Sequence, residues 1–177
     1  MPKIALVTPD ESHELQFLAA VHASRKLHRP WTYPPNTPKL FDEYLASLRN
    51  GSRIGYLVVA EHGGLAAWIN IGGVIRGLFQ NGFLGYSAFL PYDGQGYVSS
   101  GLRKVITLAF REHRLHRLEA NIQPGNSRSI HLARRLGFAH EGFSRKYLKI
   151  GGRWADHERF AMTADAWRAA KTLTPEV

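Results

Sequence analysis

The sequence predicts a mixed α/β fold in which helices flank one twisted sheet of parallel and antiparallel strands. Segments with strand character lie on both sides of an amphipathic helix predicted at 97–112. Glycine turns such as His62-Gly63-Gly64 and Gly151-Gly152 join neighbouring strands as hairpins, which makes those pairs antiparallel. A fully parallel sheet is therefore excluded. At 177 residues the chain is expected to form a single domain over residues 1–177.

The N-terminal part of the chain carries one strand and two helices. Lys3–Val7 has the character of a strand, and a helix is predicted from Asp10 to about His28. Thr37 is a typical N-cap and Pro38 suits the first position of the second helix. A rigid aromatic loop over residues 29–35 connects the two helices.

The rest of the chain contains six strands and two helices. Besides the helix at 97–112, a short helix is predicted over 127–136. Asn126 precedes it, and an Asn side chain can accept hydrogen bonds from the free amide groups of a first turn. Gly137 suits the left-handed position that follows a helix. The predicted strands lie at about 53–60, 65–71, 82–90, 116–122, 141–150 and 153–162.

Composition limits the chemistry that the chain can perform. It contains no Cys, which excludes disulfides, thiolate metal sites and a cysteine nucleophile. His113-x-x-His116 spans a helix end without a third ligand, so no metal site is expected. No apolar run is long enough to span a membrane, and the N-terminus lacks the character of a signal peptide. We therefore expect a soluble, unprocessed, cytoplasmic protein.

The net charge of +9 is large for this length and favours acidic partners, such as cofactor phosphates or the RNA around a ribosome. A charge scattered over the surface for solubility explains it equally well. The basic residues are dispersed and never form a run of five. No specific nucleic-acid site is therefore expected.

The most informative motif is Tyr92-Asp93-Gly94-Gln95-Gly96-Tyr97, which connects an aromatic-rich strand to the central helix. A glycine turn that opens a helix leaves several N–H groups unpaired at the positive end of the helix dipole. This pattern predicts a site for the pyrophosphate of a nucleotide-bearing cofactor, although an ordinary tight turn is the alternative. A dinucleotide fingerprint would need glycine where the chain has Ser99, and a P-loop sequence is absent.

Two segments together resemble the GNAT superfamily of acyl-CoA N-acyltransferases. One is the glycine turn with its helix. The other is Asn126-x-x-Ser129-x-x-Leu132-x-x-x-Leu136-Gly137-Phe138, which has one more residue before Gly-Phe than the family pattern. The resemblance implies the GNAT fold, whose two central parallel strands, here 82–90 and 116–122, part to admit pantetheine.

The sequence is also similar to the GNAT branch that acetylates ribosomal-protein N-termini, especially the N-terminal alanine acetyltransferases. The similarity runs from about residue 5 to 167 and is specific from about residue 68 onward. The stretches that carry it are Val74–Gly77, Leu84–Tyr86, Gly94–Gly96, His116–Asn121, Gly137–Phe138, Glu141–Phe143, Tyr147–Leu148 and Trp154–His157.

The resemblance implies that acetyl-CoA is the cofactor. Its pyrophosphate would lie at the start of the central helix, and pantetheine would pass near the Asn-capped helix. One position departs from the family, because the Arg or Gln that opens the turn is Pro91 here. Since backbone amides do most of the holding, we expect CoA binding to survive this change. The implied cofactor contacts are Phe89, Leu90, Gly94, Gln95, Gly96, Tyr97, Val98, Asn121, Asn126 and Ser129.

Acetyl transfer to an amine needs a neutral amine, a polarised carbonyl and a proton donor for the departing thiolate. Without Cys, the simplest mechanism is direct attack in a ternary complex. The resemblance places Tyr147 near the CoA sulfur, and a phenol with a pKa of about 10 stays protonated at neutral pH and can donate. Ser129, one turn into the Asn-capped helix, is the alternative donor. Either hydroxyl can instead be purely structural.

The sequence contains no evident general base. Some members of the ribosomal branch carry a glutamate directly after the position of Tyr147, where this chain has Leu148. A protein α-amine with a pKa of about 8 is partly neutral at pH 7, whereas a Lys amine at about 10.4 is almost wholly charged. A water held by polar groups can then suffice. Asn70, Asp156 and His157 are the candidates to hold it; otherwise Asp156 and His157 are structural residues of an edge strand.

We therefore expect acetyl-CoA-dependent N-acetylation of a protein N-terminus, with a ribosomal protein or the ribosome as the partner. In the resembled branch the loop that holds Trp31 and Tyr33 lines the peptide entrance, and Asn70 is a further candidate for substrate contact. Buried packing is the alternative for the two aromatic residues. Two other functions stay open: acetylation of a small amine (an antibiotic, polyamine or amino acid), and a non-catalytic CoA- or RNA-binding module on the ribosome.

Overall fold

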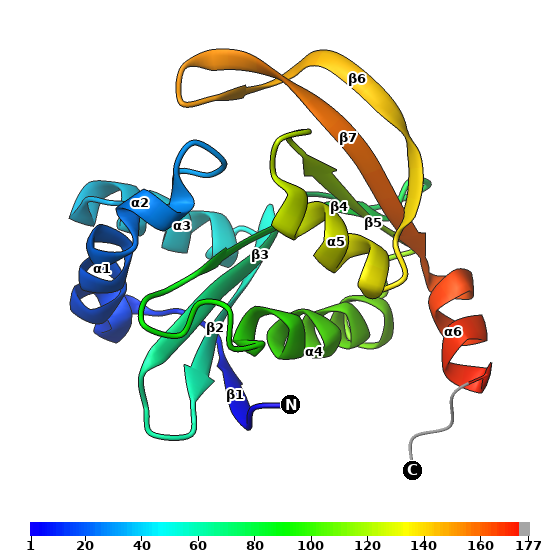
Figure 1. Cartoon of the computed structure of the whole chain (residues 1–177). Helices are drawn as coiled ribbons and strands as arrows, with labels where there is room; N and C mark the ends of the chain where they lie inside the picture. Colours follow the sequence, from blue (N-terminus) through cyan, green and yellow to red (C-terminus); the bar gives the residue numbers. More distant parts are fainter. Residues whose placement is uncertain (174–177) are drawn as a thin grey trace.

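A seven-stranded mixed sheet forms the centre of the computed structural model, which describes residues 1–173 (Figure 1). The end of the expected domain, residues 174–177, lies outside the described residues. The pair β4–β5 is parallel and the other neighbouring strands are antiparallel, which confirms the predicted mixed sheet. In spatial order the strands are β1 (Ile4–Val7), β2 (Arg53–Ala60), β3 (Leu65–Ile75), β4 (Asn81–Ala88), β5 (Arg117–Ile122), β7 (Arg153–Thr163) and β6 (Ala139–Ile150).

The two central strands, β4 and β5, part along their length. They pair only from Asn81 opposite Arg117 to Phe83 opposite Glu119. Beyond this point β4 continues to Ala88 with β3 as its partner, and β5 continues with β7 as its partner. The facing backbone groups of β4 and β5 are therefore left without a strand partner at one end of the sheet. This arrangement confirms the predicted parting of the central strands.

Different helices cover the two faces of the sheet (Figure 1). α1 (Glu14–Ala23) and α3 (Pro38–Arg49) share one core, while α4 (Tyr97–Arg111) and α5 (Ser127–Arg135) pack in the other. Neighbouring residues of β2 show that both faces are buried. Leu57 belongs to the core under α1 and α3, and Val58 belongs to the core under α4, because strand side chains alternate between faces.

The first predicted helix is divided into three pieces: a 3₁₀ turn (Glu11–His13), α1, and α2 (Arg25–His28). The break falls at Ser24, whose backbone leaves helical values (φ −94°, ψ 7°). Ser24 Oγ accepts a hydrogen bond from Leu90 N–H at 2.9 Å. This long-range contact accompanies the break, and periodicity along the segment does not reveal it. It anchors α2 beside the end of β4, where the two central strands part.

Two other helices show how far local signals reach. α3 begins at Pro38 as predicted, and Thr37 Oγ1 accepts a hydrogen bond from Leu40 N–H at 3.3 Å. The sequence does not predict α6 (Ala164–Leu173), which follows β7 directly. In the described part of the chain, no helix is both long enough and apolar enough to cross a membrane.

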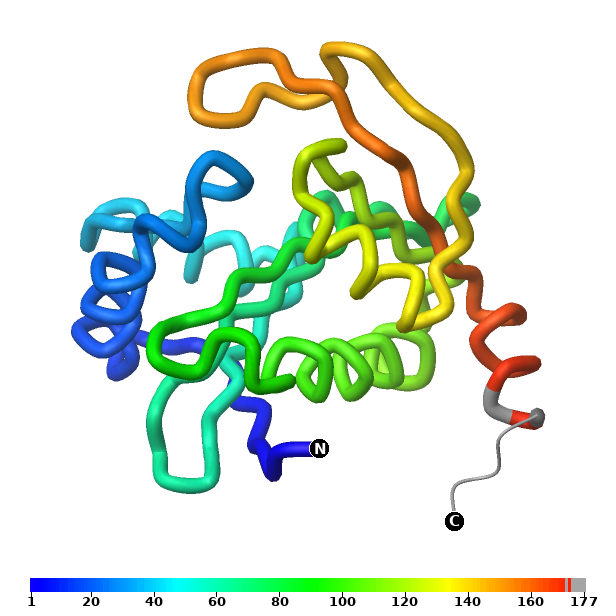
Figure 2. Tube along the Cα trace, viewed as in Figure 1, coloured from blue at the N-terminus to red at the C-terminus, as the bar shows by residue number. Residues whose placement is uncertain are grey.

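The strand that holds Asp156 and His157 is internal, which corrects the expectation of an edge strand. β7 lies between β5 and β6 and pairs with both of them. Its pairing with β5 ends at Glu158, so the residues of β7 before that point pair with β6 alone. This free part of the β6–β7 hairpin arches over the parted strands (Figures 1 and 2).

Candidate active site

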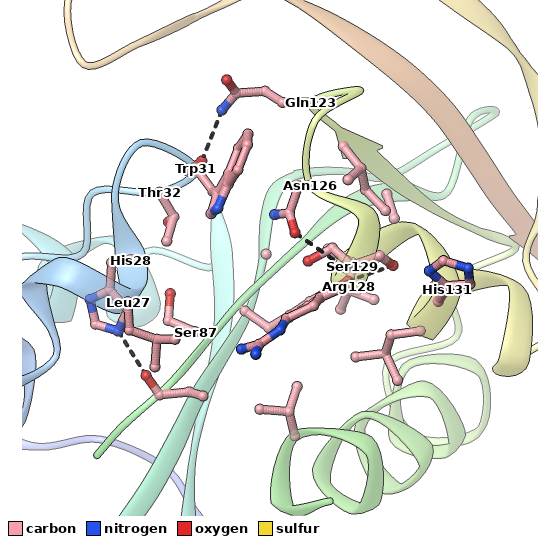
Figure 3. Close-up of a pocket in the computed structure, with 18 of the residues that line it drawn as sticks. Leu27, His28, Trp31, Thr32, Ser87, Gln123, Asn126, Arg128, Ser129 and His131 are labelled. Atoms are coloured by element: carbon pink, nitrogen blue, oxygen red, sulfur yellow. Dashed lines mark hydrogen bonds between the residues drawn. The ribbon is translucent and has the colours of Figure 1, made fainter. Parts of the chain in front are cut away.

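A cavity of about 960 Å³ occupies the gap where β4 and β5 part. In Figure 3, α2 and the loop after it form one wall, α5 forms the opposite wall, and the start of α4 lies below. We call the part lined by Asp93, Gly94 and residues 96–99 the glycine end. We call the part under the β6–β7 hairpin the hairpin end; it is lined by Leu27, His28, Trp31, Thr32, Leu148, Ile150 and His157.

The glycine end is built from main chain. Gly94 and Gly96 have left-handed backbones (φ +72° and +87°), which favour glycine. Gly96 is the N-cap of α4, and no side chain caps this helix. The first intrahelical bond runs from Ser100 N–H to Gly96 O at 2.9 Å, so the amides of residues 97–99 have no carbonyl partner within the helix. They lie at the positive end of the helix dipole, which suits a phosphate.

Gln95 and Pro91 complete the glycine turn from outside the cavity. Gln95 Nε2 donates to Pro91 O at 2.6 Å, and neither residue lines the cavity. The side chain of Gln95 therefore braces the turn, and the predicted contact of this residue with the cofactor is left to its backbone amide. The departure from the family pattern at Pro91 likewise changes a residue that does not face the cavity.

α5 presents a cationic face to the cavity. Its N-cap is Asn126, whose Oδ1 accepts a hydrogen bond from Ser129 N–H at 3.2 Å, as the sequence predicts. Arg128, His131 and Arg135 also line the cavity. The sequence motif does not include these three residues. Their spacing of three and four residues places them on one helix face, and this spacing could have identified them from the sequence.

Two polar atoms in the strand walls have no hydrogen-bond partner among the described residues. They are Asn121 Oδ1 on β5 and Ser87 Oγ on β4, and both residues line the cavity. Buried polar groups are almost always paired, so these atoms indicate a polar ligand in the gap. Nearby, Tyr86 Oη donates to Ser129 O at 3.4 Å. Burial raises the pKa of Tyr86, so its phenol stays protonated at neutral pH.

Phe89 and Leu90, which were expected to contact the cofactor, do not line the cavity. Phe89 is fully buried in the core under α1 and α3, edge-on to Phe17 with 5.8 Å between ring centroids. Leu90 is exposed and its N–H is held by Ser24. The physical reason is that β4 ends at Ala88 and the chain turns there, so the alternation of strand side chains does not continue.

Trp31 lines the hairpin end and closes it against the loop after β5. A Cβ placed on Gly125 would come within 3.0 Å of Trp31 Cη2, so the indole ring lies directly on this glycine. Gln123 Nε2 donates to Trp31 O at 3.2 Å (Figure 3). Because both its ring and its carbonyl are held, Trp31 forms a fixed wall.

Tyr33, predicted to lie in the loop that lines the peptide entrance, contacts the hairpin and does not line the cavity. It borders a smaller pocket of about 250 Å³ beside α2. Its hydroxyl lies over Gly151 at the tip of the β6–β7 hairpin, where a Cβ would come within 2.2 Å of Tyr33 Oη. The Arg29 guanidinium stacks on its ring at 4.6 Å from the centroid. Tyr33 therefore joins the loop after α2 to the hairpin.

His28 fixes α2 to the end of β4. Its Nε2 lies 2.7 Å from Ala88 O (Figure 3). A carbonyl oxygen only accepts, so Nε2 carries the hydrogen and Nδ1 holds the lone pair. His28 Nδ1 is buried without a partner among the described residues. Burial lowers the pKa of His28, so the ring is neutral at pH 7.

The two predicted hydroxyl donors lie in different places. Ser129 lines the cavity beside Asn126 (Figure 3), and no described residue is hydrogen-bonded to its Oγ. Tyr147 does not line the cavity. Its ring packs edge-on against His157, with 6.1 Å between the centroids. Ser129 is therefore the better placed of the two donors.

A bulge in β6 decides which hairpin side chains face the cavity. The β6–β7 register shifts between Ser144 and Leu148, and Lys146 has a left-handed backbone (φ +46°). Asp156 Oδ1 accepts a hydrogen bond from Lys146 N–H at 2.7 Å and holds the bulge. Beyond it, Leu148 and Ile150 line the cavity. Asp156 thus has a structural role.

Of the three residues predicted to hold a water, His157 alone lines the cavity. Asn70 is buried on β3, outside the lining, and its Nδ2 donates to Gly85 O at 3.3 Å; its contact with substrate stays a prediction. His157 is 2% exposed, and burial lowers its pKa, so its ring is neutral at pH 7.

Charge is distributed unevenly around the cavity. Among the described lining residues, Asp93 supplies the only carboxylate, and it lies at the glycine end. Arg128 and Arg135 add positive charge from α5. The hairpin end is neutral, because its residues are apolar, a threonine and two histidines with lowered pKa values.

Residues 3–139 match the acetyltransferase (GNAT) domain family. The chain belongs to the GNAT family of acetyl-CoA-dependent N-acetyltransferases. The predicted fold, cofactor and class of reaction are thereby confirmed. Two features of the cavity fit this cofactor: the unpaired amides of residues 97–99 suit its phosphates, and the unpaired polar atoms of Asn121 and Ser87 suit the amides of pantetheine.

Two curated relatives carry related names. "Probable N-acetyltransferase YjcK" of Bacillus subtilis is 33% identical over 125 residues, which cover 70% of this GNAT chain and 69% of the relative. "[Ribosomal protein uS5]-alanine N-acetyltransferase" of Escherichia coli is 40% identical over 98 residues, 55% of this chain and 50% of the relative. The match thus spans half the length of the E. coli enzyme. It confirms the predicted similarity to ribosomal-protein alanine acetyltransferases.

Solved GNAT structures share the fold. Mycobacterium smegmatis RimJ in complex with CoA-disulfide has a TM-score of 0.81 at 22% identity, covering 94% of this chain and 88% of that chain. A spermidine N-acetyltransferase, SpeG from Vibrio cholerae, has a TM-score of 0.76 at 16% identity, covering 93% and 96%. A ribosomal-protein-S5-alanine acetyltransferase from Vibrio fischeri also shares the fold, with a TM-score of 0.82 at 23% identity. Proteins with this fold therefore include, by name, both a ribosomal-protein acetyltransferase and a spermidine acetyltransferase, and the acceptor must be argued from the site.

Proposed function

We propose that this GNAT enzyme acetylates the α-amino group of a protein N-terminus in the cytoplasm, with a ribosomal protein as its substrate, by direct attack in a ternary complex. The observation that carries the proposal is the neutral hairpin end of the cavity, whose described lining has no carboxylate. The 40% identity to an enzyme named for the alanine of uS5 supports the ribosomal substrate class.

The lining disfavours polycationic acceptors. A polyamine or an aminoglycoside carries several ammonium groups at pH 7, and burying them requires nearby carboxylates. The described lining offers Asp93 alone, at the far end from the hairpin. A protein N-terminus brings a single charge, and its α-amine, with a pKa of about 8, is already partly neutral. The neutral hairpin end therefore fits a peptide better than a polyamine.

Fixed walls at the hairpin end favour a small first residue. Trp31 is held in place by Gly125 and Gln123 on one side of the cavity. Leu148 and Ile150 approach from the hairpin. A small apolar N-terminal residue such as alanine matches these apolar walls and lets the amine reach past them.

Different groups would hold different parts of the cofactor. The amides of residues 97–99 would bind the pyrophosphate, with Arg128 and Arg135 as counter-charges. The polar atoms of Asn121 and Ser87 would pair with pantetheine amides. Bound acetyl-CoA supplies the acetyl group as a thioester.

Ser129 would return a proton to the departing thiolate. Its hydroxyl lines the cavity, and its Oγ has no hydrogen-bond partner among the described residues, so the proton is available. A thiol with a pKa of about 8.5 leaves readily, and a single neutral donor suffices. Tyr147 is the alternative donor; its ring contacts His157 and not the cavity.

Intact-mass spectrometry of purified ribosomal proteins incubated with acetyl-CoA tests this function. We expect one acetyl group on a protein with a small N-terminal residue, and none when that N-terminus is blocked beforehand. If spermidine or an aminoglycoside were acetylated and no ribosomal protein were, the proposal would be overturned in favour of a small-amine enzyme. CoA binding without turnover of any amine would indicate a non-catalytic module.

A further inference from the structure

We propose that His157 is the general base that takes a proton from the substrate ammonium group. This inference rests on the proposed function, because it requires an amine acceptor at the hairpin end of the cavity. It is carried by the place of His157 in the cavity lining and by the hydrogen bond that fixes its ring. A base is needed there because the described lining of this end has no carboxylate.

One hydrogen bond determines which ring nitrogen is free. His157 Nδ1 lies 3.0 Å from Ala155 O, and a carbonyl oxygen only accepts, so Nδ1 carries the hydrogen in the neutral ring. Nε2 then holds the lone pair. In the described part of the chain no group is hydrogen-bonded to Nε2. An imidazole held in a single tautomer with its acceptor nitrogen unpaired is suited to accept a proton.

The surroundings keep this ring neutral. Burial lowers the pKa of His157, and this effect outweighs the bond to Ala155 and the charge of Asp156, which both raise it. Tyr147 from β6 faces the ring edge-on. The cationic face of α5 opposes a second positive charge in the same cavity. Asp156 and Glu158 flank His157 on β7, and the other titratable side chains that line the cavity are His28, Tyr86, Tyr92, Asp93, Tyr97, Arg128, His131 and Arg135.

Neither of the other two histidines in the lining has this arrangement. His28 donates through Nε2 to Ala88 O, and its remaining nitrogen is buried. His131 is exposed on α5, and its Nδ1 is bonded to Ser127 O of its own helix at 2.7 Å. At the hairpin end, His157 therefore has an unpaired nitrogen, Nε2, that is not fully buried, whereas the unpaired nitrogen of His28 is.

The proton balance is as follows. An N–H bond of the ammonium breaks, an Nε2–H bond forms on His157, and the electron pair stays on the amine nitrogen, which becomes a neutral nucleophile. The imidazolium releases this proton to solvent. When the new amide bond forms and the bond to sulfur breaks, the hydroxyl donor gives its proton to the departing sulfur, and the second proton of the nitrogen passes to the hydroxyl oxygen and restores the donor. Overall, one proton is released for each acetyl group transferred.

The His157→Asn variant removes the proposed base and is designed to keep the hydrogen bond to Ala155 O. The Asn amide nitrogen can replace Nδ1–H as the donor to Ala155 O, but the amide oxygen is not basic enough to take a proton in place of Nε2. We expect kcat on an N-terminal peptide to fall about 10²-fold at pH 7, with the KM for acetyl-CoA unchanged and the melting temperature lowered by the loss of buried ring volume. The matched control is His140→Asn on β6, whose imidazole pairs with Glu158 outside the cavity lining and whose loss should leave the rate unchanged.

The pH profile of kcat/KM provides a second readout. Only the neutral ring accepts a proton, so the rate of the wild-type enzyme should fall as pH falls through the pKa of His157, below its ordinary value of about 6.5. This acid limb should vanish in His157→Asn, because a variant without the base can use only the neutral amine, and its rate should instead rise through the α-amine pKa near 8. A peptide that carries an aminooxyacetyl group at its N-terminus has a nucleophile that is neutral at pH 7, and it should restore the variant to within about threefold of the wild type.

Nitrogen-15 NMR of the protein without substrate tests the ring independently of turnover. The expected result is an Nδ1–H tautomer for His157, assigned by its loss in His157→Asn, that stays neutral at pH 7. An Nε2–H tautomer, a charged ring at pH 7 or an unchanged kcat in the variant would overturn the inference while leaving peptide acetylation intact. Wild-type turnover of spermidine but not of peptides would instead overturn the proposed function, and the same variant would then be scored on spermidine.

Discussion

The two ends of the cavity are built in different ways. The glycine end comes from one continuous segment of main chain, in which Gly94 and Gly96 turn the chain and the amides of residues 97–99 remain unpaired. The hairpin end comes from side chains of segments that are far apart in the sequence, including Trp31 on the loop after α2 and His157 on β7. A main-chain site is determined locally, whereas a side-chain site depends on how the whole sheet is assembled.

This difference has a functional consequence. A site made of backbone amides recognises the phosphates that every acyl-CoA shares, so it can stay constant while the acceptor changes. Side chains at the hairpin end set the acceptor. Changes at the glycine end should therefore act on CoA affinity, and changes at the hairpin end should act on the peptide.

The largest effect is expected from Gly96→Val at the glycine end. A left-handed backbone costs an L-residue about 1–2 kcal/mol, and more for a β-branched residue, so the turn should rearrange and misplace the amides of α4. We expect CoA affinity, measured by calorimetry, to fall more than about 10²-fold. Space is not the cause, because the nearest atom to a Cβ at this position is Pro2 Cδ at 3.6 Å.

Gln95→Ala is the matched control in the same turn. Its side chain lies outside the cavity, so CoA affinity should stay within about threefold of the wild type. Equal affinities for the two variants would mean that the phosphates bind elsewhere, and the comparison between the two ends would fail.

The next effect concerns the hydroxyl donor between the ends. Ser129→Ala should lower kcat about 10²-fold with little change in either KM, the range for a single acid–base group. Tyr147→Phe keeps the ring contact with His157 and should change kcat less than about threefold. Steady-state kinetics of both variants measure this. The opposite order would make Tyr147 the donor and would show that the hairpin moves over the cavity during turnover.

The fold could be predicted from the sequence wherever local rules decide. The periodicity of apolar residues located β2 and β4, and Asn126 located the start of α5 by its capping chemistry. The break at Ser24 could not be predicted, because its contact with Leu90 joins residues far apart in the chain. The internal position of β7 depends on strand order, which no local pattern encodes.

The same division applies to the site. The sequence predicted the glycine turn. It did not predict the role of Ser87 on β4, because that role depends on the parting of two strands that lie far apart in sequence. Tyr147 was expected near the sulfur; its ring packs against His157, beside the bulge that Asp156 and Lys146 N–H hold, and the sequence does not show this bulge. A backbone irregularity of this kind shifts side chains between faces, and its cause is a tertiary hydrogen bond.

A smaller effect is expected from Trp31→Ala at the hairpin end. The indole forms a fixed wall of the acceptor site, so its loss should raise the KM for an N-terminal peptide about tenfold, in line with the removal of one buried aromatic contact. The KM for acetyl-CoA should not change. Equal increases in both KM values, measured by varying each substrate in turn, would contradict the separation of the two ends.

Gly125→Ala gives a graded version of the same test. The added methyl group would approach Trp31 Cη2 to 3.0 Å, so the ring must shift by a few tenths of an ångström. We expect an increase in peptide KM of about threefold, smaller than for Trp31→Ala and in the same direction. An unchanged KM would mean that the position of the indole does not matter to the substrate.

The most direct test of α-amine acetylation compares three acceptors at pH 7. They are a peptide with a free N-terminal alanine and no Lys, an N-terminally blocked peptide with one Lys, and spermidine. About a tenth of an α-amine with a pKa near 8 is neutral at this pH, against roughly 0.04% of a Lys amine, a ratio of about 200. We predict that kcat/KM for the first peptide exceeds the others by at least about 10²-fold. Equal or faster turnover of the Lys peptide or of spermidine would contradict acetylation of protein N-termini as the function.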